Sequence, residues 1–111
     1  KLEVGSQRML ETVNRPGAGI DFEGIVSGLA DMPGIIIQAL FVKGSVDNRD
    51  GAALGDWISA LARVRPIEVQ IYSLDRPVPD KGLVAVDIEE LESIARLVRS
   101  KLDVKAKAYG R

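Results

Sequence analysis

The fold is decided by Ile35-Ile36-Ile37-Gln38-Ala39-Leu40-Phe41-Val42, a nearly continuous apolar run that is rich in β-branched residues. A strand with one solvent-facing side alternates apolar and polar residues, whereas an unbroken run indicates a strand covered on both faces, as in a parallel sheet. We therefore predict a central parallel strand here. The run is far shorter than the roughly 20 apolar residues that a membrane span needs.

Helices and further strands are predicted on both sides of this run. Apolar residues at helical spacing predict helices over about 7–14, 22–32, 52–64 and 88–102, the last beginning with a capping box of Asp87 and Glu90. Further strands are predicted over 1–4, 68–74 and 103–109, the last at a sheet edge. The order β-α-α-β-α-β-α-β predicts an α/β fold in one domain, with parallel strands and right-handed crossovers.

Long polar loops follow the predicted strands, at Lys43 to Gly51 and at Asp75 to Val86, whereas the turns after helices are short. Ligand sites in barrels and in open α/β sheets lie at the carboxyl ends of the strands. We expect any functional site at that end of the sheet.

Composition excludes several kinds of chemistry. The chain has no cysteine and no histidine, so it cannot build a disulfide, a thiolate nucleophile or a cysteine-held metal site. Its 15 basic and 16 acidic residues provide no charge excess for nucleic-acid binding. The chain begins at Lys1-Leu2-Glu3-Val4, without a signal segment, and we interpret it as a piece of a longer cytoplasmic protein with no membrane contact.

Polar residues on predicted strands are the candidate site residues. Lys1 and Glu3 share one strand face, which is either a surface edge or part of a barrel lumen. Gln38 interrupts an apolar strand, where a satisfied core glutamine is favoured over a ligand contact, because a buried amide needs a hydrogen-bond partner. Gln70 and Tyr72 also share a face, which indicates a polar lumen or cleft unless that face belongs to an exposed antiparallel sheet.

Several segments, taken in order, resemble the second half of a radical S-adenosylmethionine protein of the Fe–S oxidoreductase branch. In that branch a lysine-leucine-aspartate-alanine-glycine strand end precedes an asparagine-arginine-proline turn. The matching segments are Lys1-Leu2-Glu3-Val4-Gly5-Ser6, Asn14-Arg15-Pro16, Gln38-Ala39-Leu40-Phe41-Val42-Lys43-Gly44, Val46-Asp47-Asn48 and Glu68-Val69-Gln70-Ile71-Tyr72-Ser73-Leu74-Asp75-Arg76-Pro77. The resemblance lies in their joint order and spacing.

The resemblance implies a partial (β/α) barrel of six parallel strands. Its other half would carry a Cys-x3-Cys-x2-Cys motif for a [4Fe–4S] cluster, which reduces S-adenosylmethionine to produce a 5′-deoxyadenosyl radical. The implied cofactor-binding residues are Lys1, Glu3 and Ser6 near the ribose and methionine, Gln38 and Gln70 in the lumen, and Tyr72, Ser73 and Leu74 beside the adenine. Glu3 stands where the family has aspartate. Without the cysteine motif, this chain alone should bind no cofactor of its own and be inactive.

Two other classes remain open. The chain could be a self-sufficient small α/β binding or regulatory module, flavodoxin-like or anti-sigma-antagonist-like, or a structural oligomerisation piece. The expected partners are the missing amino-terminal half of the same polypeptide and, through exposed strand edges, a second copy of the chain. A cysteine motif encoded about 80–110 residues before Lys1, at roughly 30 residues per βα unit, would identify the radical enzyme.

Overall fold

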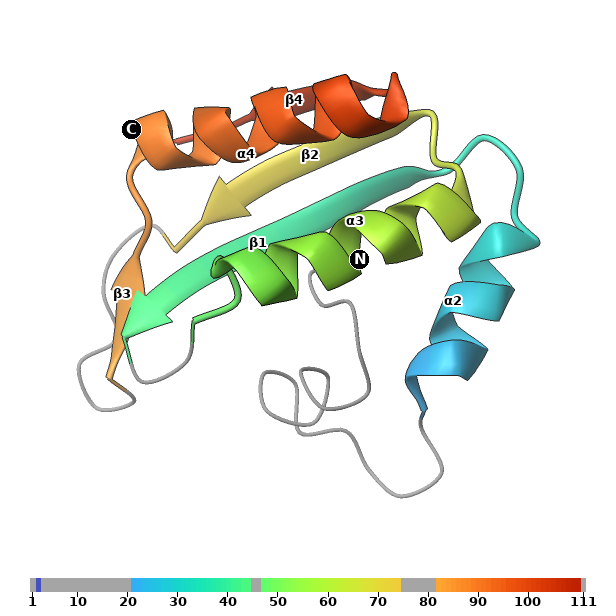
Figure 1. Cartoon of the computed structure of the whole chain (residues 1–111), viewed down its shortest axis with the longest axis horizontal. Helices are drawn as coiled ribbons and strands as arrows, with labels where there is room; N and C mark the ends of the chain where they lie inside the picture. Colours follow the sequence, from blue (N-terminus) through green and yellow to red (C-terminus); the bar gives the residue numbers. More distant parts are fainter. Residues whose placement is uncertain (1, 3–20, 45–46, 75–81, 111) are drawn as a thin grey trace.

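The computed structural model describes residues 2, 21–44, 47–74 and 82–110. The first predicted strand apart from Leu2, the predicted helix over 7–14 and the candidate site residues Lys1, Glu3 and Ser6 lie outside the described residues. The described chain is an α/β fold with one four-stranded sheet and three helices (Figure 1). The predicted class is confirmed.

The helices and strands lie close to where the apolar patterns predicted them, with one addition. In chain order they are α2 (Phe22–Ala30), β1 (Ile36–Gly44), α3 (Gly51–Val64), β2 (Glu68–Ser73), β3 (Leu83–Ala85), α4 (Ile88–Leu102) and β4 (Lys105–Ala108). The addition is β3, which lies within the segment that the sequence predicted to be a long loop.

Each of these helices begins at an aspartate. The side chains of Asp21, Asp50 and Asp87 accept hydrogen bonds from the backbone N–H groups three residues later. The predicted capping box is only half formed, because the Glu90 carboxylate pairs with the Arg49 guanidinium at 2.5 Å instead of turning back to the helix start. Glu90 therefore ties α4 to the loop that follows β1.

The sheet has the order β3-β1-β2-β4, and its β1, β2 and β4 strands are parallel. Helix α3 connects β1 to β2, and α4 leads into β4. Both connections step across the sheet in the same direction. Because βαβ crossovers are almost always right-handed, two crossovers in the same direction place both helices on the same face. Figure 1 shows α3 and α4 on one side of the sheet, and α2 packs against α3.

The hydrophobic core lies between this face of the sheet and the helices. Every second strand residue points into it, and the helices contribute the facing apolar side chains. Its fully buried members include Ile37, Ala39, Phe41, Val69 and Ile71 from the strands, and Val26, Trp57, Leu61 and Val98 from the helices. The interpretation of Trp57 as a core residue is confirmed.

Two predictions about β1 are wrong. The strand is not covered on both faces along its whole length, because the described helices occupy only one face. Ile36 is 48% exposed, and Gln38 is also exposed. The sheet is not entirely parallel, because β3 pairs antiparallel with the end of β1, with Val42 opposite Ala85. The segment after β2 thus returns along β1 before α4 begins.

The outer edge of β1 is covered by three different groups. The Leu2 N–H donates to the Gln38 carbonyl at 3.0 Å, close to the start of the strand. Asn48, which is 1% exposed, donates its Nδ2 to the Leu40 carbonyl at 2.8 Å and accepts at Oδ1 from the Val42 N–H at 2.9 Å. The Asn48 side chain thus hydrogen-bonds the backbone of β1 as a peptide group of a neighbouring strand would. Strand β3 pairs with the last residues of β1.

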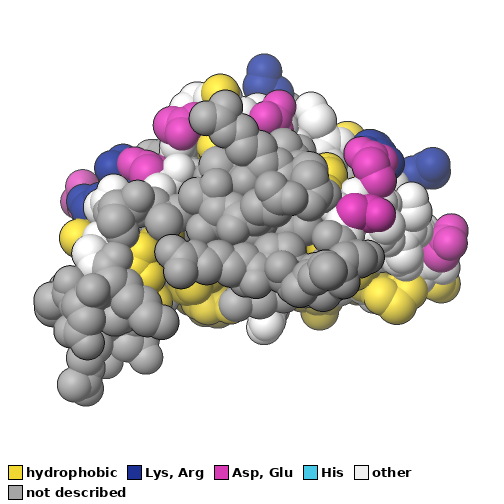
Figure 2. Space-filling view, turned by 90° about the horizontal axis from the view of Figure 1, so that it is seen from below, with side chains coloured by type: hydrophobic (Ala, Val, Ile, Leu, Met, Phe, Trp, Pro, Cys, Tyr) yellow, Lys and Arg dark blue, Asp and Glu magenta, His cyan; other side chains and the backbone are white. Residues whose placement is uncertain are grey.

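The surface carries both charged and hydrophobic side chains. In the view onto the lower side of the molecule, charged side chains gather in the upper half and hydrophobic ones along the lower margin (Figure 2). The exposed large hydrophobic residues in the described ranges are Met32, Ile36, Ile67, Val84 and Tyr109. No helix in the described part of the chain is long and apolar enough to cross a membrane.

The substitution Gly28→Ala should stabilise the protein by about 0.4–1 kcal/mol, because glycine is a poor helix former and loses more entropy on folding. A methyl group at Gly28, in α2, would meet no atom within 4 Å. Gly34→Ala is the matched control: that position is equally open, but its φ of +68° strains any side chain, so stability should fall. Urea unfolding measures both, and changes of the same sign would contradict this expectation.

Candidate functional site

The face of the sheet opposite the helices, here called the open face, carries side chains in three rows. The register places Ile36, Glu68 and Lys105 in the row nearest the amino ends of the strands, Gln38, Gln70 and Lys107 in the middle row, and Leu40 and Tyr72 nearest the carboxyl ends. The predicted residues Gln38, Gln70 and Tyr72 therefore do share one face.

The middle row and the row nearest the amino ends form one hydrogen-bonded network. Gln38 Nε2 donates to Gln70 Oε1 at 3.2 Å, and Gln70 Nε2 donates to Glu68 Oε2 at 2.8 Å. Lys105 Nζ lies 3.0 Å from Glu68 Oε1. Because an ionised carboxylate can only accept, Glu68 fixes which end of the Gln70 amide faces it, and Gln70 then orients Gln38. Among the described residues, no donor is bonded to Gln38 Oε1.

Glu68 is the anchor of this network. Its side chain is 15% exposed, and its pKa lies below the ordinary value, first because Gln70 donates a hydrogen bond to the carboxylate and second because Lys105 does. Folding therefore favours the charged form of Glu68. The network keeps its acceptor end charged at neutral pH and loses it only in acid.

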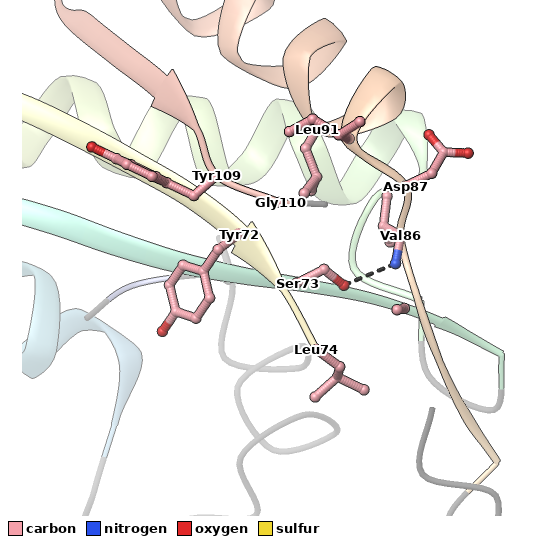
Figure 3. Close-up of a pocket in the computed structure, with 10 residues that line it drawn as sticks. Tyr72, Ser73, Leu74, Val86, Asp87, Leu91, Tyr109 and Gly110 are labelled. Atoms are coloured by element: carbon pink, nitrogen blue, oxygen red, sulfur yellow. Dashed lines mark hydrogen bonds between the residues drawn. The ribbon is translucent and has the colours of Figure 1, made fainter. Parts of the chain in front are cut away.

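A pocket of about 460 Å³ opens where β2 and β4 end, next to the start of α4 (Figure 3). This strand-end pocket is lined by Tyr72, Ser73, Leu74, Ala85, Val86, Asp87, Ile88, Leu91, Tyr109 and Gly110. Its lining residues with polar side chains are Tyr72, Tyr109, Asp87 and Ser73, and in Figure 3 both tyrosine hydroxyls point away from Ser73 and Asp87. The pocket lies at the carboxyl ends of the parallel strands, the end of the sheet at which the long loops led us to expect a site.

Ser73 lies in the pocket wall but is occupied in holding strands together. Its hydroxyl donates to the Phe41 carbonyl at 2.5 Å and accepts from the Val86 N–H at 2.8 Å, a contact drawn in Figure 3. In Figure 3 the Tyr72 and Ser73 side chains leave β2 in different directions, as alternation along a strand requires. Leu74 follows at the strand end.

Of the two interpretations of Gln38, the favoured one, a core glutamine, is wrong, because the residue is exposed. The amide has a hydrogen-bond partner, but on the exposed open face. Sequence reasoning missed Tyr109, which lines the pocket. The Lys107 Nζ lies over the Tyr109 ring, 5.4 Å from the ring centre. The alternation Lys105, Lys107, Tyr109 was the available signal, because it places all three side chains on one face.

The described residues hold no group of three or more His, Cys, Asp or Glu side chains that could bind a metal ion. Because the whole chain lacks cysteine, it supplies no ligand for an iron–sulfur cluster. The site is a tyrosine-rimmed pocket beside an amide and carboxylate network. No protein-family model, curated protein or solved structure matches the chain.

Proposed function

We propose that the chain is the carboxy-terminal half of a partial (β/α) barrel in a radical S-adenosylmethionine enzyme, and that its open face lines the lumen. The observation that carries this proposal is that the three parallel strands β1, β2 and β4 follow one another in one direction, with the described helices on one face and rows of polar side chains on the other. Barrel interiors are filled by such rows from neighbouring strands. A doubly wound, flavodoxin-like sheet would carry helices on both faces.

The residues of this chain would position the cofactor, while the cluster would belong to the cysteine-bearing half of the same polypeptide. S-adenosylmethionine, when bound, supplies the adenosyl group that reacts with substrate. Tyr72 and the backbone of Ser73 and Leu74 would flank the adenine at the strand-end pocket. Gln38 offers a carbonyl oxygen and an N–H group in the lumen, oriented through Gln70. Alone, the chain would be inactive.

A specific observation also favours the alternative, a self-sufficient binding module: the chain buries a contiguous core of its own beneath the sheet. A module of this kind would bind its ligand at the strand-end pocket without another polypeptide segment. S-adenosylmethionine titrated into the isolated chain separates the two. Affinity equal to that of the longer polypeptide would favour the module, whereas binding only by the longer polypeptide supports the half-barrel.

In the cluster-bearing polypeptide, Tyr72→Phe should weaken S-adenosylmethionine binding about 2- to 13-fold, the equivalent of one neutral hydrogen bond of about 0.5–1.5 kcal/mol. The ring remains, so stability should hardly change. Ile94→Val is the control, since it trims a core side chain that is 4% exposed and should cost about 0.5–1.5 kcal/mol of stability with no binding defect. Calorimetric titration and a thermal melt measure both quantities.

Two results would contradict the half-barrel. One is normal binding and turnover by Gln38→Ala, Gln70→Ala and Tyr72→Phe together with reduced stability, which would make the three residues purely structural. The other is a coding sequence without a cysteine motif before Lys1.

A further inference from the structure

The outer edge of β4 carries backbone groups that no described strand pairs with. β4 is the last strand of the sheet, and the Tyr109 N–H donates inward to the Ile71 carbonyl at 2.8 Å. Because peptide groups alternate direction along a strand, those of Ala106 and Ala108 point away from β2. Arg99 Nη1 donates to the Ala106 carbonyl at 2.6 Å from outside the ladder, as this direction requires.

The segment that ends in β4 is the basic part of an almost neutral chain. Five of the basic residues and only one acidic residue lie between Arg96 and Gly110, although the whole chain has a net charge of -1. Lys105 and Lys107 are exposed and stand on the open face of β4 itself. Lys105 is paired with Glu68, so Lys107 is the positive charge that this strand presents on the open face. The Ala106 carbonyl accepts from Arg99, which leaves the Ala106 N–H and the Ala108 peptide groups facing outward without a described strand beside them.

A second copy of the chain is a poor occupant for this edge. Pairing β4 with β4 would place its lysines against those of the copy, and like charges opposite one another destabilise a sheet. Lysines on an edge strand protect against such pairing. Lys107 favours a strand with an acidic side chain beside it, whose neighbouring apolar residues would lie beside Ala106 and Ala108 on the helix side.

We propose that the outer edge of β4 binds an extended acidic segment of a partner protein, which adds to the sheet as its next strand. The Ala106 N–H and the Ala108 peptide groups supply the ladder bonds, and Lys107 selects an acidic residue on the open face. This interaction does not depend on the radical chemistry proposed above.

The test uses a short fluorescent peptide that alternates glutamate and valine, titrated into the full chain and followed by anisotropy. A lysine–valine peptide of equal length is the control and should not bind. Ala108→Pro removes an outward N–H without breaking an internal ladder bond, so the fold should survive and affinity should fall about 10-fold. Lys107→Glu should weaken the acidic peptide about 5-fold and admit the basic one.

Amide hydrogen exchange at Ala108 gives a readout that does not depend on a variant folding. Protection of this amide on addition of the acidic peptide is expected, and its absence would overturn the proposal. Equal binding of both peptides, or of neither at millimolar concentration, would do the same. If Lys107→Glu abolishes binding while the folded Ala108→Pro variant binds normally, the edge binds anions by charge alone. In that case a single-stranded oligonucleotide should compete with the acidic peptide as well as an unlabelled copy of the peptide does, which would identify binding by charge alone.

Discussion

Trp57→Ala should cost about 3–5 kcal/mol of unfolding free energy, as expected when a large buried aromatic side chain is replaced by a methyl group. The indole is fully buried, and its ring lies edge-on to that of Phe41 with centres 5.1 Å apart. Its Nε1 also donates to the carbonyl of Leu2 at 2.9 Å. One side chain from α3 thus joins the core to a residue far away in sequence. Urea unfolding measures the loss.

Trp57→Phe separates the two contributions. It keeps an aromatic ring against Phe41 but leaves the carbonyl of Leu2, a residue only 3% exposed, without its donor. The variant should be less destabilised than Trp57→Ala, and amide exchange at Leu2 should accelerate more than exchange in the middle of α3. Equal acceleration at both places would mean that the indole N–H does not hold Leu2 in place.

The sequence predicted best what depends on local pattern. The cores of α2, α3 and α4 follow from apolar spacing, and Asp87 at the start of α4 follows from capping preferences. Strand β3 could not be found in this way, because it has three residues and forms only by pairing with β1. Its position depends on where the chain returns after β2, which no local pattern encodes.

For the candidate site too, the features that depend on local pattern were predictable, and those that depend on strand pairing were not. Alternation along β2 correctly placed Gln70 and Tyr72 on one face. The contacts between strands were not predictable, because the Glu68–Lys105 pair and the Gln38–Gln70 bond depend on register, and a shift of one residue would move each side chain to the opposite face. Exposure of Gln38 was missed because the neighbouring apolar residues suggested a doubly covered strand.

Asn48 is a buried polar residue whose side chain is bonded to the backbone of β1. At the edge of β1 its Oδ1 accepts from the Val42 N–H and its Nδ2 donates to the Leu40 carbonyl. An amide matches both groups at once. A carboxylate of the same shape can accept from Val42 but has nothing to donate to Leu40, and its charge would be buried at a position that is 1% exposed.

Asn48→Asp should therefore cost about 3 kcal/mol or more at neutral pH, because it leaves a charge buried against a carbonyl oxygen. Folding should raise the pKa of the new carboxyl above its ordinary value of about 3.9, since the protonated form can donate to Leu40. Below that ordinary value the group is protonated in both states, and the penalty should nearly vanish. As the pH rises through the folded-state pKa, the penalty becomes complete.

The matched control is Asn48→Ala, which loses the bonds to Val42 and Leu40 at every pH. Its stability difference from the parent chain should stay constant, whereas that of Asn48→Asp should grow between acidic and neutral pH. Urea unfolding at several pH values, always compared with the parent chain at the same pH, measures the two curves. A flat difference for Asn48→Asp would mean that water reaches the carboxylate, and that the edge of β1 is not sealed by this side chain.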